Sequence, residues 1–282
     1  MIEFGKFNKL KVVKKVDFGL YLDGEEAGEI LLPQKYVKNT KDIGDEINVF
    51  LYYDSEDRPI ATTIKPKANV GDFAYLKVVS TTGIGAFLDW GLEKDLFVPI
   101  NEQRIKLLRG NYSVVYIYID ERDKRIVASA KLDKFIDNDP QNLEYNQEVD
   151  LLIYKESDLG FNAIINNKYS GILFYNELLA DLNIGEQIKG YIKKIREDGK
   201  IDLSMQKQGY EKIDDVSQKI LDIIKSKGGV IYCNDKSDPD LIYSLFGESK
   251  RTYKMAVGKL FKNKIINIYE NRIELIMGVN SE

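Results

Sequence analysis

Aromatic side chains follow closely spaced glycines in this chain, and their spacing raises a question about chemistry. In the stretch TTGIGAFLDWGLEKDLFVP, residues 81–99, two glycines lie two apart and precede Phe87 and Phe97. A phosphate-cradling loop needs a further glycine and a following helix, whereas Leu96 to Val98 is typical of a strand. The chemistry that remains is stacking, in which exposed aromatic rings on strands bind unpaired nucleobases.

Other kinds of chemistry are disfavoured by the composition. The 282 residues include no histidine and one cysteine, Cys233. Histidine-based catalysis, histidine metal sites and internal disulfides are therefore excluded, and this cysteine usage is typical of a reducing cytoplasm. We find no Walker-type glycine loop and no EF-hand spacing. We expect no catalytic residues, no metal and no cofactor.

The charge and hydropathy patterns also restrict the partners. The formal net charge is −4, whereas a dedicated binder of duplex nucleic acid is usually basic. Any nucleic-acid contact must therefore be local, or depend on stacking as well as on charge. No apolar run approaches the roughly 20 residues that cross a bilayer, and the first residues lack a signal-peptide core. We expect a cytoplasmic protein with no membrane partner.

The elements that position the aromatic residues repeat three times. Counted from Gly5, Gly71 and Asn146, glycines recur at offsets 14 and 39, isoleucine at offset 55 and a small hydroxyl residue at offset 58. The residues concerned are Gly19, Gly85 and Gly160; Gly44, Gly110 and Gly185; Ile60, Ile126 and Ile201; and Thr63, Ser129 and Ser204. Three copies with four shared offsets indicate three domains of one type.

Each copy has the pattern of five short strands. In the second copy, GDFAYLKVVS, GAFLDW, DLFVP, YSVVYIYID and RIVASA are rich in β-branched and aromatic residues, and DERDK is typical of a hairpin turn. Five strands in so short a segment predict a small closed barrel of the OB type. We expect Gly85 and its equivalents to interrupt the second strand and allow a bulge or a tight bend.

The last part of the chain changes to a helical pattern. Val216, Ile220 and Ile224 share one face of a helix. Asp238 is the predicted N-cap of a second helix that Gly247 ends, and Ser249 is the predicted N-cap of a third. A hairpin around Glu270 and Asn271 follows. Three helices and a two-stranded wing predict a winged helix.

The repeated segments resemble the ribosomal S1-type RNA-binding domain, a variety of OB-fold. The Phe-Gly-x-Phe element of that domain is resembled by three segments, DFGLYL, GIGAFL and DLGFNA. Its entry to strand three is resembled by AGEILLP, EKDLFVP and YSGILFYN, and its final Leu-Ser by KIDLSMQ. Three such domains with a helical tail resemble the conserved virulence factor B family of bacteria. The resemblance implies a mainly β chain of three tandem five-stranded S1-type barrels, at 1–66, 67–138 and 143–208, followed by a small α+β winged-helix domain at 211–282.

The resemblance also implies which side chains bind RNA. The stacking positions of S1-type domains correspond to Phe18, Tyr21 and Leu31, to Ile84, Phe87 and Phe97, and to Leu159, Asn162 and Phe174, so no copy has three aromatic residues. Weak modules would then act together. The predicted RNA-binding residues are Phe18, Tyr21, Phe87, Phe97, Phe161, Phe174, Lys77, Lys193, Lys194 and Arg196. The same aromatic side chains could instead belong to the barrel cores, and the charged ones to a solvated face.

The third helix of the tail is rich in basic residues. Residues 249–264 carry six bases and no acid, and we predict that these bases contact nucleic acid: Lys250, Arg251, Lys254, Lys259, Lys262 and Lys264. The resemblance implies a non-catalytic protein that binds single-stranded RNA with low sequence specificity and regulates gene expression after transcription. A DNA-binding regulator that uses the winged helix and a scaffold that docks a protein partner remain as alternatives.

Overall fold

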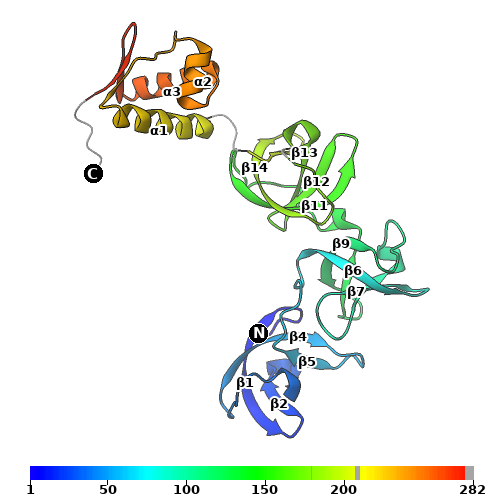
Figure 1. Cartoon of the computed structure of the whole chain (residues 1–282). Helices are drawn as coiled ribbons and strands as arrows, with labels where there is room; N and C mark the ends of the chain where they lie inside the picture. The colour runs from blue at the N-terminus through cyan, green and yellow to red at the C-terminus, as the bar shows by residue number, and fades with distance from the viewer. Residues whose placement is uncertain (179, 207–209, 277–282) are drawn as a thin grey trace. The chain divides into compact units, whose positions relative to one another are not determined.

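The chain forms two compact units, Met1–Leu203 and Ser204–Glu282. Its structure is a computed structural model that describes residues 1–178, 180–206 and 210–276. The first unit contains three closed five-stranded barrels (Figure 1). The second contains helices and a small sheet. The stretch KQGYEKIDD, residues 207–215, has the composition of a linker, but a helix begins within it at Tyr210; residues 207–209 lie outside the described residues.

The first barrel shows the topology that the other two repeat. Its strands are β1 (Phe7–Val16), β2 (Gly19–Asp23), β3 (Glu29–Pro33), β4 (Glu46–Tyr53) and β5 (Pro59–Thr62). They close in the order β1-β2-β3-β5-β4, and β3 pairs with β5 in parallel. Along β2 and β3, side chains alternate between the barrel interior and the outer face, because successive residues of a strand point to opposite sides.

The second and third barrels close in the equivalent order. The second consists of β6 (Phe73–Thr81), β7 (Gly85–Asp89), β8 (Leu96–Pro99), β9 (Tyr112–Ile119) and β10 (Ile126–Ser129). The third consists of β11 (Glu148–Ser157), β12 (Gly160–Ile165), β13 (Tyr169–Phe174), β14 (Gln187–Ile195) and β15 (Ile201–Ser204). The predicted three barrels are therefore confirmed, and so is the hairpin turn between β9 and β10, where the Asp120 amide donates to the Arg125 carbonyl.

The repeat found in the sequence corresponds to repeated hydrogen bonds. The amides of Gly5, Gly71 and Asn146 donate to the carbonyls of Leu51, Ile117 and Ile192. The amides of Gly44, Gly110 and Gly185 likewise donate to Val12, Val78 and Ile153. One offset needs a correction of a single residue. Thr62, not Thr63, ends β5 and caps the following turn as Ser129 and Ser204 do, because its hydroxyl accepts from the amide two residues on.

The expected role of the glycines in strand two was wrong in one respect. Gly19, Gly85 and Gly160 begin β2, β7 and β12 rather than interrupting them. The irregular register lies instead on the first strand of each barrel, for example between Val78 and Ser80. A Cβ on these glycines would lie only 2.3, 2.3 and 2.0 Å from a carbonyl oxygen of strand three. Close approach of two backbones therefore requires glycine here.

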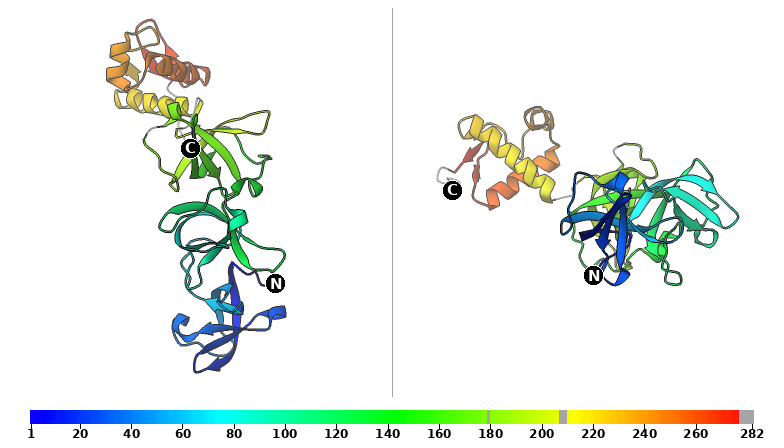
Figure 2. Two further views of the ribbon diagram at one scale, coloured as in Figure 1. Left: turned by 90° about the vertical axis from the view of Figure 1, so that its right-hand side faces the viewer. Right: turned by 90° about the horizontal axis from the view of Figure 1, so that it is seen from below.

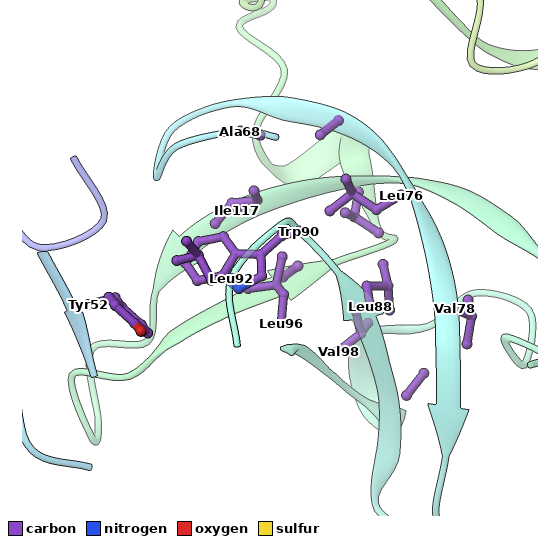
Figure 3. Packing of buried hydrophobic residues seen from close by; sticks show 14 of the residues in the cluster. Tyr52, Ala68, Leu76, Val78, Leu88, Trp90, Leu92, Leu96, Val98 and Ile117 are labelled. Atoms are coloured by element: carbon purple, nitrogen blue, oxygen red, sulfur yellow. The ribbon is translucent and has the colours of Figure 1, made fainter. Parts of the chain in front are cut away.

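The first barrel has a core of its own but buries two aromatic residues in the hydrophobic core of the second. Phe50 and Tyr52 of β4 belong to the same buried cluster as Trp90, Leu92 and the interior of the second barrel. Figure 3 shows Tyr52 facing the labelled Trp90 and Leu92. The Trp90 ring packs edge-on to Phe50, with centroids 5.8 Å apart, and its Nε1 donates to the Lys94 carbonyl at 2.7 Å. The junction is therefore packed like an interior rather than left as a loose linker.

The second and third barrels also meet through buried residues. Phe73 of β6 and Leu152 and Ile164 of the third barrel are in one cluster. The amide of Phe73 donates to Asn167 Oδ1 at 2.7 Å, and Asn167 Nδ2 donates to the Gly71 carbonyl at 2.9 Å. Asn167 has a φ of +56°, a conformation that asparagine adopts more readily than most residues.

The second unit has the elements predicted for a winged helix. In the described residues these are α1 (Tyr210–Ser226), β16 (Val230–Ile231), α2 (Pro239–Phe246), α3 (Lys250–Lys262), β17 (Ile266–Ile268) and β18 (Ile273–Leu275). Both predicted caps are present, since Asp238 accepts from the Asp240 amide and Ser249 from the Thr252 amide. Figure 2 shows α1 alongside the other helices of this unit, and α1 and α3 are in contact.

Two features of this unit go beyond the sequence pattern. The wing has a third, very short strand, because β16 pairs with β18. The core consists of one cluster that includes Ile220, Phe246 and Tyr253, all nearly or fully buried. Among the described helices of the whole chain, none combines the length and the apolarity that crossing a membrane would require.

Candidate nucleic-acid interface

The first barrel carries an exposed aromatic pair on its outer face. Leu20 and Leu22 of β2 point into the core, so Tyr21 points outward and is half-buried. Phe18, in the turn before β2, is 59% exposed. The two rings lie edge to face with centroids 6.4 Å apart, and Lys14 Nζ lies 5.5 Å from the centre of the Tyr21 ring. Two accessible rings and a cation are therefore together on this face.

The second barrel has a cross-strand aromatic pair at the equivalent place. Phe87 of β7 and Phe97 of β8 are directly opposite in the register. Both are half-buried, and their ring centroids are 5.0 Å apart with the planes tilted by 40°. Ile84, in the loop before β7, is 68% exposed. The sequence prediction thus identified two rings that the fold brings together.

The third barrel differs in which aromatic ring it exposes. Phe161 is only 7% exposed, because it occupies an inward position of β12 equivalent to Ala86 of β7, and Asn162 holds the outward position. Of the predicted residues, Phe161 therefore offers little ring surface for stacking. Phe174 is half-buried at the end of β13, and the Arg196 guanidinium lies 5.8 Å from its ring. The site here is one ring under one cation.

Sequence reasoning missed an aromatic side chain on the third barrel. Tyr175 follows Phe174 directly and is 46% exposed. Its hydroxyl donates to Glu156 at 2.9 Å, and its ring lies edge-on to Phe161 with centroids 5.9 Å apart. Tyr175 is visible in the segment YSGILFYN, one residue beyond Phe174, which is the predicted stacking position.

The predicted cations of the barrels differ in their availability. Lys77 and Lys194 are exposed. Lys193 forms an ion pair with Glu177, and Arg196 pairs with Asp202 at 2.7 Å. Hydrogen bonding to Asp202 raises the pKa of the Arg196 guanidinium, which is charged at every working pH in any case. Lys193 and Arg196 would have to leave or share a carboxylate to contact a phosphate.

A carboxylate from the first barrel lies against cations of the second. Asp57, in the turn between β4 and β5, contacts Lys94 Nζ at 3.0 Å and Arg125 Nη2 at 2.5 Å. The hydrogen bond from Lys94, reinforced by Arg125, holds the pKa of Asp57 below its usual range. Sequence reasoning missed these three residues, because Lys94 and Arg125 lie 37 and 68 residues from Asp57 in the chain. Asp57 therefore neutralises cations beside the aromatic pair of the second barrel.

The second unit exposes bases along α3. Arg251, Lys254 and Lys262 are exposed, whereas Lys259 is half-buried. Lys254 Nζ lies 3.8 Å from Asp235, and Lys250 Nζ donates to the Lys236 carbonyl at 3.3 Å. The remaining predicted base, Lys264, lies just after the helix and is exposed. The buried face of α3 carries Tyr253, Ala256, Val257 and Leu260, so the helix presents its basic side to solvent.

The wing of the second unit adds aromatic surface that the sequence did not reveal. Tyr232 is 73% exposed and Tyr269 is 41% exposed. The Arg272 guanidinium lies 4.7 Å from the Tyr269 ring. Cys233 beside them is fully buried. In the part of the chain that the structure describes, no group of three or more cysteine or carboxylate side chains is placed to hold a metal ion.

Two family models match segments of this chain. Residues 4–64 match the S1 domain, and residues 218–275 match the CvfB-like winged helix domain. Both are nucleic-acid-binding domain types, so the chain has the domain composition of a nucleic-acid-binding protein. The segments are the first barrel and most of the second unit.

Relatives extend the similarity to nearly the whole chain. Conserved virulence factor B of Staphylococcus epidermidis is 27% identical over 280 residues, which cover 96% of this chain and 94% of that protein. Conserved virulence factor B of Staphylococcus aureus is 26% identical over 282 residues, with 96% and 93% covered. A solved structure, a multidomain protein with nucleic acid binding domains from Streptococcus pneumoniae, is 24% identical and covers 97% of this chain and 98% of its own, with a TM-score of 0.42.

Proposed function

We propose that this protein, which belongs to the conserved virulence factor B family, is a non-catalytic RNA-binding protein that holds single strands with low sequence preference. Its domains would be the four ranges expected from the sequence, 1–66, 67–138, 143–208 and 211–282. It would act in the bacterial cytoplasm and regulate gene expression after transcription.

The observation that carries the proposal is the recurrence of accessible rings at one place on all three barrels. Phe18 with Tyr21, Phe87 with Phe97, and Phe174 lie on the outer face of strands two and three or directly beside it. An aromatic side chain that only stabilised the core would be buried, as Phe161 is. Rings that stay accessible can stack on unpaired bases of any kind, each worth about 1–3 kcal/mol.

The three barrels would act together rather than singly. No barrel has an aromatic ring at all three predicted stacking positions, and Asp202, Glu177 and Asp57 form ion pairs with cations near the rings. Each site is therefore expected to be weak. Sites on one chain gain from effective concentration, so a single strand that reaches several of them binds more tightly than one that reaches a single site. The exposed bases of α3 would add phosphate contacts.

The test is fluorescence anisotropy with labelled single-stranded RNA and matched duplex DNA at two salt concentrations. Phe18→Ala removes the most exposed ring of the first barrel and should weaken single-strand binding about 5- to 150-fold if it stacks on a base. Tyr145→Ala is the matched control, because Tyr145 is 57% exposed but lies outside strands two and three of its barrel. It should leave binding unchanged.

Other outcomes would point elsewhere. Preference for the duplex, lost when Arg251 and Lys254 are neutralised, would indicate a DNA-binding regulator that acts through the winged helix. No binding of either nucleic acid at low salt would refute the proposal and favour a scaffold that docks a protein.

A further inference from the structure

A pocket lies where the first two barrels meet. Its volume is ≈ 490 Å³, within the range of about 300–1,000 Å³ that small-molecule sites occupy. One wall is the β4–β5 hairpin of the first barrel, with Tyr52 and Asp57. The other is the outer face of β7 and β8, with Phe87 and Phe97. Both walls belong to the same compact unit.

The pocket has an aromatic surface large enough for one planar ring system. Phe87 and Phe97 lie side by side across β7 and β8, with centroids 5.0 Å apart. The pair presents two neighbouring ring faces tilted by 40° to each other, and a base can stack on either. The pocket is therefore suited to a flat, aromatic ligand.

One of the carboxylates that line this pocket is unpaired. Asp57 is held by Lys94 and Arg125, and Glu93 forms an ion pair with Lys35. Asp95, by contrast, has no ion pair or hydrogen bond to any described residue, although it is half-buried. Its oxygens are free to accept hydrogen bonds from whatever enters the pocket.

Asp95 is also well placed relative to the rings. It directly precedes β8, two residues before Phe97, and the intervening Leu96 points into the core. Residues two apart on a strand share a face and lie about 6.5 Å apart. The edge of a base stacked on Phe97 would therefore reach the Asp95 carboxylate, which can only accept hydrogen bonds when ionised.

We propose that this pocket binds a guanine base, stacked on Phe87 and Phe97, with its Watson–Crick edge on the Asp95 carboxylate. The inference rests on the proposed function, since a single strand of RNA would supply the base. Guanine places two donors, N1–H and the N2 amino group, side by side, which matches the two oxygens of one carboxylate. Adenine and cytosine place an acceptor beside their amino group, and uracil flanks N3–H with two carbonyl oxygens. Each of these would bring an acceptor against the carboxylate.

The electrostatics around Asp95 agree with this assignment. Burial and the nearby charge of Asp89 raise the pKa of Asp95, so both disfavour its charged form. Donors from a guanine would supply the hydrogen bonds that burial has removed. The charged side chains that line the pocket are three carboxylates, Asp57, Glu93 and Asp95, and two cations, Lys94 and Arg125. The pocket therefore contributes base recognition and little attraction for phosphate.

The experiment compares RNA octamers of uridine that carry one central guanosine, adenosine, cytidine or uridine, with guanosine alone as a separate probe. The wild type should bind the octamer with guanosine at least about tenfold more tightly than the all-uridine octamer, given the discrimination of a good bidentate pair. Asp95→Asn should abolish the preference for guanosine, because an amide offers one donor and one acceptor, and all four bases have an adjacent donor and acceptor on this edge. Glu121→Gln, an exposed carboxylate change on the same barrel, should leave the preference as it is.

The outcomes separate this inference from the proposed function. Equal affinity of the wild type for all four octamers overturns the guanine assignment while leaving RNA binding intact. So does a guanosine preference that survives Asp95→Asn with the fold preserved, as judged by the fluorescence of Trp90. Binding of guanosine alone, sensitive to Asp95→Asn and without affinity for any octamer, would support the pocket and refute RNA binding as the function.

Discussion

Substitution of Gly85 tests the packing argument behind the GIGAFL stretch. A Cβ at this position would lie 2.3 Å from the Val98 carbonyl oxygen and 2.6 Å from the Phe97 ring. Ordinary contacts need about 1 Å more than this. The ring can move, but the carbonyl belongs to β8 and cannot yield without disturbing the barrel. Overpacking of this kind costs about 1–3 kcal/mol, and we expect Gly85→Ala to lie near the upper end.

Gly83, two residues earlier, provides a matched control. A Cβ there would meet nothing within 4 Å, and the residue does not have a left-handed φ. Gly83→Ala should therefore be neutral or slightly stabilising, by about 0.4–1 kcal/mol, because alanine reduces the entropy of the unfolded chain. The two variants differ only in whether the added methyl group has space.

The measurement is urea unfolding followed by tryptophan fluorescence. The chain has a single tryptophan, Trp90, which is 3% exposed in the core of the second barrel, where Phe50 and Tyr52 of the first barrel are also buried. The signal thus reports on this region even if the two units unfold separately. We expect a lower midpoint for Gly85→Ala and an unchanged or higher one for Gly83→Ala. Equal midpoints for the two variants would refute the claim that close backbone approach requires glycine at position 85.

Three further perturbations have expected outcomes. Asp57→Asn should free Lys94 and leave Arg125 with its longer pair to Asp123, at 3.8 Å. We expect the dependence of log K on log salt to steepen by about 0.7 for one new phosphate contact with a single strand, and by up to about 1.4 if Arg125 makes a second. An unchanged slope in an anisotropy titration would contradict this. Asp95→Asn should raise the urea midpoint at neutral pH, because burial and Asp89 raise the pKa of Asp95 and its ionisation therefore costs stability above that pKa. The gain in midpoint should shrink as the pH falls through the pKa of Asp95, and a gain that persists in acid would refute this explanation. Asp238→Ala should destabilise the second unit by about 1 kcal/mol through loss of its helix cap, detected as a lower thermal midpoint in circular dichroism.

The sequence was informative where the backbone itself imposes a residue type. Gly5, Gly71 and Asn146 all have positive φ and make the same hydrogen bond, so their spacing revealed the repeat directly. The caps Asp238 and Ser249 were predictable for a similar reason, since a local hydrogen bond selects them.

The sequence was less informative where the outcome depends on a single step of register. Phe161 and Asn162 exchange inside for outside with one residue of displacement along β12. The sequence shows aromatic residues near the DLGFNA segment, but it does not show which of their rings is accessible. Contacts between barrels could not be predicted either, because no local sequence pattern around Asp57 indicates that it pairs with Lys94 and Arg125.

The junction between the first two barrels limits how such a chain can be rearranged. Phe50 and Tyr52 are buried against the second barrel, so a first barrel transplanted alone would carry two large rings into water. Domains joined only by flexible linkers can be deleted or exchanged one at a time, whereas these two barrels cannot. In recombination, whether by evolution or by design, we expect the first barrel to move only together with the second.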